Sequence, residues 1–111
     1  MPLYLVRCRY TPEAWQGLVA NPEDRTQLAE QVCERFGGKL HNLFFAFGEH
    51  DLIEIIEAPD NKTMMAIMMA STSAGSLTDV TTTVLVSGAE ARDAMAIAGE
   101  QAGVYRRPEA E

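Results

Sequence analysis

The sequence predicts an α+β fold: one four-stranded antiparallel sheet with helices packed on one of its faces. Three observations predict it. Strand-like and helical segments follow one another in the order β-α-β-β-α-β-α, helix start signals precede the helical segments, and only four turn residues separate the second strand from the third. Such an order requires two βαβ halves that are joined by a hairpin.

The first half begins with a strand over Leu3–Tyr10, which is rich in aliphatic and aromatic residues. Thr11 is a suitable N-cap and Pro12 a suitable first residue for a short helix. Asn21, which precedes a proline and two acids, predicts the cap of a second helical stretch. Gly37-Gly38 ends that stretch.

A hairpin joins the two halves. The strand over Leu40–Phe47 ends the first half, the strand over Leu52–Ala58 begins the second, and the residues Gly48–Asp51 suit the turn between them. Asp60 then predicts the cap of a methionine-rich helix that ends near Gly75. A Thr- and Val-rich strand follows over Leu77–Val86. Ser87 and Glu90 form a capping box for the last helix. We expect a domain over residues 1–99 and a loose tail over residues 100–111.

This element order is the ferredoxin-like plan, which leaves one sheet face without helices. The hairpin strands nevertheless carry apolar residues on both sides, with Phe45 and Phe44 alternating, and Ile56 and Ile55 alternating. Strands that are apolar on both sides are buried on both sides. We therefore predict a homodimer in which two sheets pack face to face.

Composition excludes several function classes. A chain of 111 residues forms one domain, and its net charge of −7 argues against nucleic acid and anionic membranes as partners. It contains no apolar run of the roughly 20 residues that a membrane span needs, and its first residues lack a signal-peptide pattern, so we expect a cytoplasmic protein. Cys8 and Cys33 lie in apolar patterns, which predicts reduced, buried thiols.

Several segments together resemble the GYD domain family: "MPLYLVRCRYTPEAW" at the start, "NPEDR", "GGKL", "FAFGEHDL" and "APDN". The likeness covers most of residues 1–99 in order and spacing. It implies a dimeric α/β-barrel assembly, and the broader group includes cofactor-independent monooxygenases, isomerases, haem-binding enzymes and ligand sensors. Gly48 and Asp51 match the motif that gives the family its name, whereas His50 stands where the motif has tyrosine.

His50 and Asp51 are the candidate catalytic residues. An imidazole with adjacent carboxylates has the groups for proton transfer, with His50 as the base and Asp51 orienting it. Gly and Asp are also preferred in turns for geometric reasons alone, so the segment has a purely structural interpretation as well.

Five further residues are candidates for ligand binding. Arg7 or Arg9 can meet Glu54 across neighbouring strands, as a buried ion pair or as charges that hold an anionic group. Tyr10 and Trp15 can line a pocket between the sheet and the helices, or belong to the core. His41 interrupts an apolar strand near its start. We predict no metal site and no cofactor. The candidate ligand residues are Arg7, Tyr10, Trp15, His41 and Glu54.

These observations support a small-molecule-binding domain with an apolar or aromatic ligand. An enzyme of this kind would be a cofactor-independent monooxygenase or isomerase acting on an enolisable or phenolic compound. The alternative is a non-catalytic ligand sensor or a homo-oligomeric assembly module. Fold-level analogy does not decide between them.

Overall fold

The computed structural model describes residues 1–109 and has the expected α+β fold. A four-stranded antiparallel sheet has the strand order β2-β3-β1-β4. The two central strands come from the two different halves of the chain, which is the ferredoxin-like arrangement. The strands are β1 (Leu3–Tyr10), β2 (Lys39–Phe45), β3 (Leu52–Glu57) and β4 (Leu77–Leu85).

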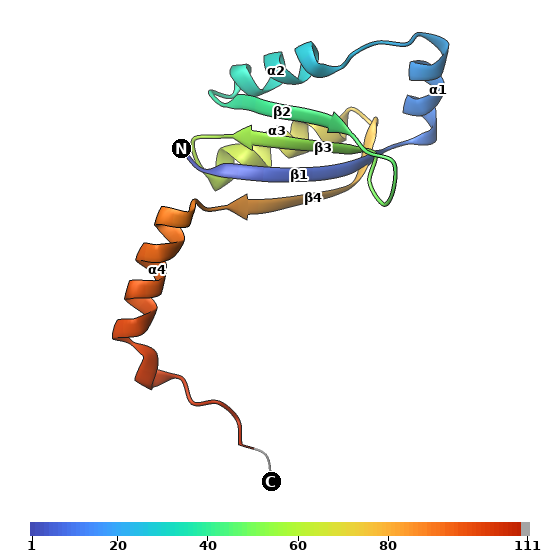
Figure 1. Cartoon of the computed structure of the whole chain (residues 1–111). Coiled ribbons are helices and arrows are strands. Elements are labelled where there is room, and N and C mark those ends of the chain that lie inside the picture. The colour runs from blue at the N-terminus through green and yellow to red at the C-terminus, as the bar shows by residue number, and fades with distance from the viewer. Residues whose placement is uncertain (110–111) are drawn as a thin grey trace.

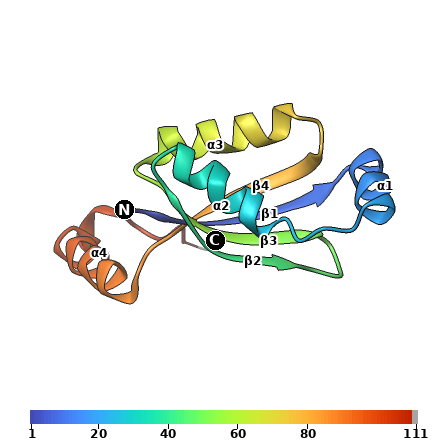
Figure 2. The same cartoon turned by 90° about the horizontal axis from the view of Figure 1, so that it is seen from above.

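Two helices, α2 (Thr26–Arg35) and α3 (Asn61–Ser73), lie side by side over one face of the sheet (Figure 2). The short helix α1 (Pro12–Ala20) lies beyond the end of the sheet. The last helix, α4 (Gly88–Glu100), leaves the sheet after β4 and extends away from the rest of the chain (Figure 1). Only α2 and α3 therefore form the helical layer.

Three of the predicted caps are confirmed. The side chains of Thr11, Asp60 and Ser87 each accept a hydrogen bond from the backbone N–H three residues later, at 3.2, 2.8 and 3.0 Å. These bonds satisfy amide groups that have no partner within the first turn of a helix. Local sequence was therefore sufficient to locate the starts of α1, α3 and α4.

The predicted cap at Asn21 is wrong. The backbone N–H of Asn21 donates to Gly17, so this residue ends α1 instead of starting α2. The next helix begins at Thr26, whose N–H and hydroxyl both donate to Asp24 Oδ1. The hydrogen bonds at the start of α2 are therefore accepted by Asp24, while the N-cap position, Arg25, makes no side-chain capping bond.

The hairpin strands are shorter than predicted. β2 ends at Phe45, two residues before the expected Phe47, and β3 ends at Glu57. Beyond the paired strands, the backbone N–H of Ala46 donates to Asp51 at 2.8 Å and closes the loop. A register shift between Leu40 and Asn42 interrupts the strict alternation of side chains in β2.

The sheet has a helix-covered face and an open face, and alternate residues of β1 and β3 occupy them. We call these the helix face and the open face. Buried side chains from β1, β3, α2 and α3 form the core on the helix face: Tyr4, Val6, Cys8, Tyr10, Cys33, Leu52, Ile56, Met64 and Ile67.

The open face is apolar but has no helical cover. It carries the odd-numbered residues of β1 and β3, together with residues that pair with them on the edge strands. The apolar members are half-buried or exposed: Leu3, Leu5, Phe44, Ile53, Ile55 and Leu85. The expectation that both sides of these strands are apolar is thus met, whereas the predicted sheet-on-sheet homodimer stays a prediction.

The tail was expected over residues 100–111, but its first residue, Glu100, is still the last residue of α4. A short 3₁₀ turn follows over Ala102–Val104, and residues 110–111 lie outside the described part of the chain. No residue of α4 is buried. Among residues 1–109, no helix has the length and apolar character that crossing a membrane requires.

Candidate functional site

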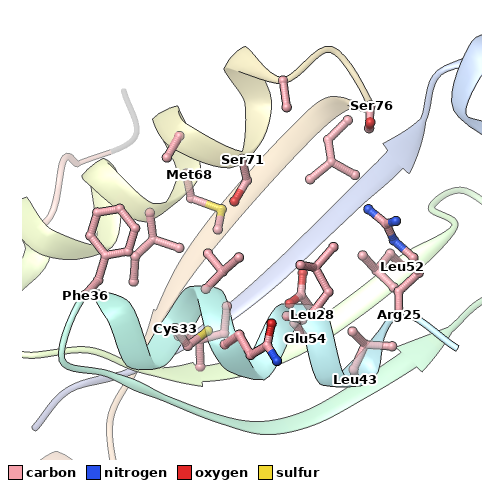
Figure 3. A pocket seen from close by; sticks show the side chains of 18 of the residues that line it. Arg25, Leu28, Cys33, Phe36, Leu43, Leu52, Glu54, Met68, Ser71 and Ser76 are labelled. Carbon is pink, nitrogen blue, oxygen red and sulfur yellow. The ribbon is translucent and has the colours of Figure 1, made fainter.

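A cavity of about 470 Å³ lies on the helix face, between α2, α3 and the sheet. Figure 3 shows Met68 and Ser71 reaching toward it from α3, with Leu28 and Cys33 on α2 below them. Most of its lining is apolar. The wall residues are Leu28, Ala29, Val32, Cys33, Phe36, Leu43, Leu52, Ile56, Ile67, Met68, Ala70 and Leu77.

Glu54 supplies a carboxyl group to this apolar cavity. Its position in β3, between Leu52 and Ile56 on the same face, directs it under the helices, where only 7% of the residue is exposed. Burial raises the pKa of the Glu54 carboxyl to about 7. No hydrogen bond or ion pair within residues 1–109 compensates for this desolvation. The carboxyl therefore changes its charge near neutral pH.

Arg25 and Tyr10 line the cavity as well. In Figure 3 Arg25 lies at the opposite end from Phe36. Its guanidinium is already paired, because Nη1 lies 2.6 Å from Glu23 Oε1. Burial raises the pKa of Tyr10, and the nearby guanidinium of Arg25 opposes that rise. This end of the cavity thus holds a neutralised cation and a neutral phenol.

The two thiols are free and buried, as predicted. Burial raises the pKa of Cys33 to about 11 and that of Cys8 to about 12, and the negative charge of Glu54 adds to both shifts. A thiol reacts as its thiolate, so both groups are unreactive near neutral pH. Cys33 contributes to the cavity as a small apolar surface.

Arg7 and Arg9, which the sequence allowed to meet Glu54, do not pair with it in the structure. Arg7 lies opposite Ile53, and Glu54 lies opposite Val6, so the arginines project from the open face while Glu54 projects from the helix face. Successive side chains of a strand point to opposite faces, and this register places the two charges on different sides of the sheet. Arg9 instead approaches Asp79, at 3.6 Å.

Asp51 connects the hairpin to the end of β1. Its Oδ2 atom accepts hydrogen bonds from the backbone N–H of Tyr10, at 3.0 Å, and from Trp15 Nε1, at 3.3 Å. Its own N–H donates to Cys8. The rings of Tyr10, Trp15 and Phe45 pack together beside it, with centroids 5.2–6.3 Å apart. The bonds of this carboxylate fix backbone and indole positions, which supports the structural interpretation of the turn.

The two histidines lie apart from the cavity. His50 is half-buried in the hairpin loop, and neither it nor Asp51 lines the cavity. His41, near the start of β2, places Nε2 2.9 Å from Glu57 Oε1 at the sheet surface. Of the candidate residues, the structure brings Tyr10 and Glu54 to the cavity, Trp15 to the Asp51 cluster, and Arg7 and His41 elsewhere.

Sequence reasoning missed most of the cavity wall. Arg25, Cys33, Met68 and Ser71 come from two helices that approach each other only in the folded chain. The one local signal was Glu54 itself, an acid within the apolar run of β3. Among residues 1–109, no three His, Cys, Asp or Glu side chains are grouped so that they can hold a metal ion.

The chain is similar to a relative of comparable length and to several solved structures. The chain is 27% identical over 81 residues to the "Glutamine synthetase and cystathionine beta-lyase binding protein" of Thermus thermophilus, covering 73% of this chain and 85% of the relative. Among solved structures, MtbAldR matches 78% of this chain with a TM-score of 0.54 at 15% identity. The chain spans about half of MtbAldR (52%). FFRP-DM1 matches over 78% of this chain and 100% of its own, with a TM-score of 0.48 and 15% identity.

The model of one family matches nearly the whole of the folded part. It spans residues 4–96, from β1 into α4, and includes both the cavity and the Gly48–Asp51 turn. On this match, the chain belongs to the family described as the GYD domain.

Proposed function

We propose that this GYD domain binds a small apolar molecule in the cavity between α2, α3 and the sheet. The observation that carries the proposal is an apolar cavity of about 470 Å³ with one unpaired carboxyl, that of Glu54, in its wall. Ligand sites in proteins are mostly apolar clefts of roughly this size with a few polar groups that orient the ligand. An unpaired buried carboxyl is costly to stability, so its presence is best explained by a ligand that uses it.

A cavity-filling variant tests this proposal. Ser71 reaches toward the cavity from α3, whereas Ser73, two residues later, is exposed and does not line it. A thermal-shift and NMR screen with apolar aromatic and aliphatic compounds should find ligands for the wild type and for Ser73→Trp, and none for Ser71→Trp. Equal binding by both variants would place the ligand elsewhere and overturn the proposal.

We also propose that a second copy of the chain covers the open face. Its apolar side chains have no cover within residues 1–109, and the buried Nε atom of Arg7 has no hydrogen-bond partner there. Sedimentation should give a dimer for the wild type. Ile55→Asp puts a charge at the centre of the open face and should give a monomer, whereas Thr78→Asp, toward the end of β4, should not. A monomeric wild type would contradict the dimer.

A second candidate function is docking to an enzyme. The relative from Thermus thermophilus carries a name that describes binding to glutamine synthetase and cystathionine beta-lyase. This chain has an aromatic side chain that fits such a role, because Phe47 in the hairpin loop is fully exposed. Exposed aromatic anchors are typical of protein interfaces. Immobilised wild-type protein should retain purified glutamine synthetase or cystathionine beta-lyase, and Phe47→Ser should not. Retention of neither enzyme by the wild type would reject this candidate.

Catalysis on an enolisable or phenolic ligand stays a prediction, and two residues now compete as its base. His50 was expected in that role, but the titratable carboxyl that lines the cavity is Glu54. Once a cavity ligand is found, its loss or conversion in air can be followed by chromatography and mass spectrometry. Turnover that is abolished in Glu54→Gln and retained in His50→Ala would assign the base to Glu54, and the reverse pattern would assign it to His50.

A further inference from the structure

Glu54 also defines the chemistry that a cavity ligand needs. The residue is more than nine-tenths buried and its side chain lines the cavity, yet its carboxyl pairs with no cation of residues 1–109. A carboxylate in such surroundings gains most from a partner that is both positively charged and able to donate hydrogen bonds.

The other charged groups of the cavity do not supply that partner. Arg25 is engaged by Glu23 at 2.6 Å, and Arg35 is exposed at the end of α2. The remaining titratable groups are the phenol of Tyr10 and the thiol of Cys33, both neutral near pH 7 because burial raises their pKa values. The cavity therefore has one group that can become an anion, and neither arginine of its lining forms an ion pair with it.

We propose that the ligand of this cavity is an organic amine, whose ammonium group pairs with the Glu54 carboxylate while its apolar body contacts the side chains of α2 and α3. This inference rests on the proposed function, since it names the class of ligand for the same cavity. Leu28, Val32 and Met68 surround the body of such a ligand. Arg25 already shares its charge with Glu23 through Nη1, which weakens its attraction for a ligand carboxylate at that end, whereas the carboxyl of Glu54 has no such partner.

Three compounds of nearly equal size test the inference: benzylamine, benzyl alcohol and benzoate. Dissociation constants can be measured by NMR titration of the full-length chain at pH 8, where Glu54 is ionised. We expect benzylamine to bind about tenfold tighter than benzyl alcohol, as expected for one charge-assisted hydrogen bond, and benzoate to bind most weakly.

Two variants locate the effect. Glu54→Gln keeps the shape of the side chain and should reduce the preference for benzylamine over benzyl alcohol to about twofold or less. Glu30→Gln removes an acid from the exposed side of α2 and should retain the wild-type preference. In the wild type, the affinity for benzylamine should fall about tenfold between pH 8 and pH 6 as Glu54 becomes protonated, a readout that does not depend on the folding of any variant.

The outcomes separate this inference from the proposed function. Tighter binding of the alcohol or of benzoate, abolished by Ser71→Trp, would overturn the amine assignment and leave the cavity as a ligand site. An amine preference that persists in Glu54→Gln would also overturn it. Binding of none of the three compounds at millimolar concentration would count against both.

Discussion

The two faces of the sheet are built from the same strands, yet their environments differ. In β1, Tyr4, Val6 and Cys8 are buried beneath the helices, while Leu3, Leu5 and Arg7 alternate with them on the open face. The helix face combines a packed core with a cavity and a buried carboxyl. The open face combines apolar residues with Arg7, whose buried Nε atom has no hydrogen-bond partner within residues 1–109. One strand thus contributes one face to the core of the chain and, in our proposal, the other face to a contact with a second copy.

The largest expected effect is a difference in the free energy of unfolding between alanine variants of two neighbouring isoleucines of β3. Ile56 is fully buried on the helix face, and Ile55 is half-buried on the open face. Ile56→Ala should lower the free energy of unfolding by about 2–5 kcal/mol, since it removes packed atoms and leaves a cavity. Ile55→Ala should cost about 0.5 kcal/mol in a single chain, and more at high protein concentration in the dimer that we propose. Urea unfolding at two protein concentrations checks this contrast. A large, concentration-dependent loss for Ile55→Ala would show that a second copy buries the open face.

The next effect concerns the buried carboxyl of the helix face. Burial raises the pKa of Glu54 from 4.5 to about 7, so between these pH values the folded chain keeps a proton that the unfolded chain has lost. The free energy of unfolding should therefore fall as pH rises from 4.5 to 7, by about 3 kcal/mol at most. Glu54→Gln should remove this slope in urea unfolding from pH 4.5 to 8. A slope that is unchanged in the variant would assign it to other groups.

An intermediate effect is expected at the hairpin, where Asp51 connects the loop to β1 and α1. Asp51→Ala leaves the N–H groups of Tyr10 and Trp15 without their acceptor and should cost about 1–3 kcal/mol. Asp51→Asn keeps an oxygen acceptor and should cost less. Glu49→Gln, in the same loop, serves as the control and should stay within about 0.5 kcal/mol. Thermal unfolding followed by the fluorescence of Trp15 measures all three. Equal losses for Asp51→Ala and Glu49→Gln would contradict the role of Asp51.

The smallest effect is expected on the exposed sheet surface, at the pair formed by His41 and Glu57. The hydrogen bond from His41 holds the pKa of Glu57 below its usual value. His41→Ala should let that pKa rise toward its usual value, which carboxyl NMR titration can detect, while the urea midpoint stays nearly unchanged because exposed pairs contribute little. A clear loss of stability would indicate that this surface is more buried than it is in the single chain.

Much of the fold followed from local patterns. Thr11, Asp60 and Ser87 marked three helix starts, because a short polar side chain before a helix satisfies amides that no distant residue can reach. The contacts that contradict the cap at Asn21 are local too: its backbone N–H ends α1, and Asp24 accepts the hydrogen bonds of Thr26. The order of the elements was sufficient for the ferredoxin-like plan.

The candidate site was less predictable. Asp51 was identified as a notable residue, but its contacts with Tyr10 and Trp15 join positions 41 and 36 residues apart in the chain. The cavity wall on α2 and α3 carried no motif, since ordinary apolar helix residues form it. Only Tyr10 and Glu54 among the candidate ligand residues lie there.

The sequence by itself determined the order of strands and helices, the positions of most caps, and the alternation that gives β1 and β3 two apolar faces. Only the tertiary structure decided which of those faces the helices cover. That choice places Glu54 in a cavity and Arg7 on the opposite side of the sheet. The physical reason is that alternation has a period of two. A strand pattern therefore divides the residues between two faces but does not determine which face the helices cover. Register and helix packing, which depend on contacts between distant segments, assign one face to the interior.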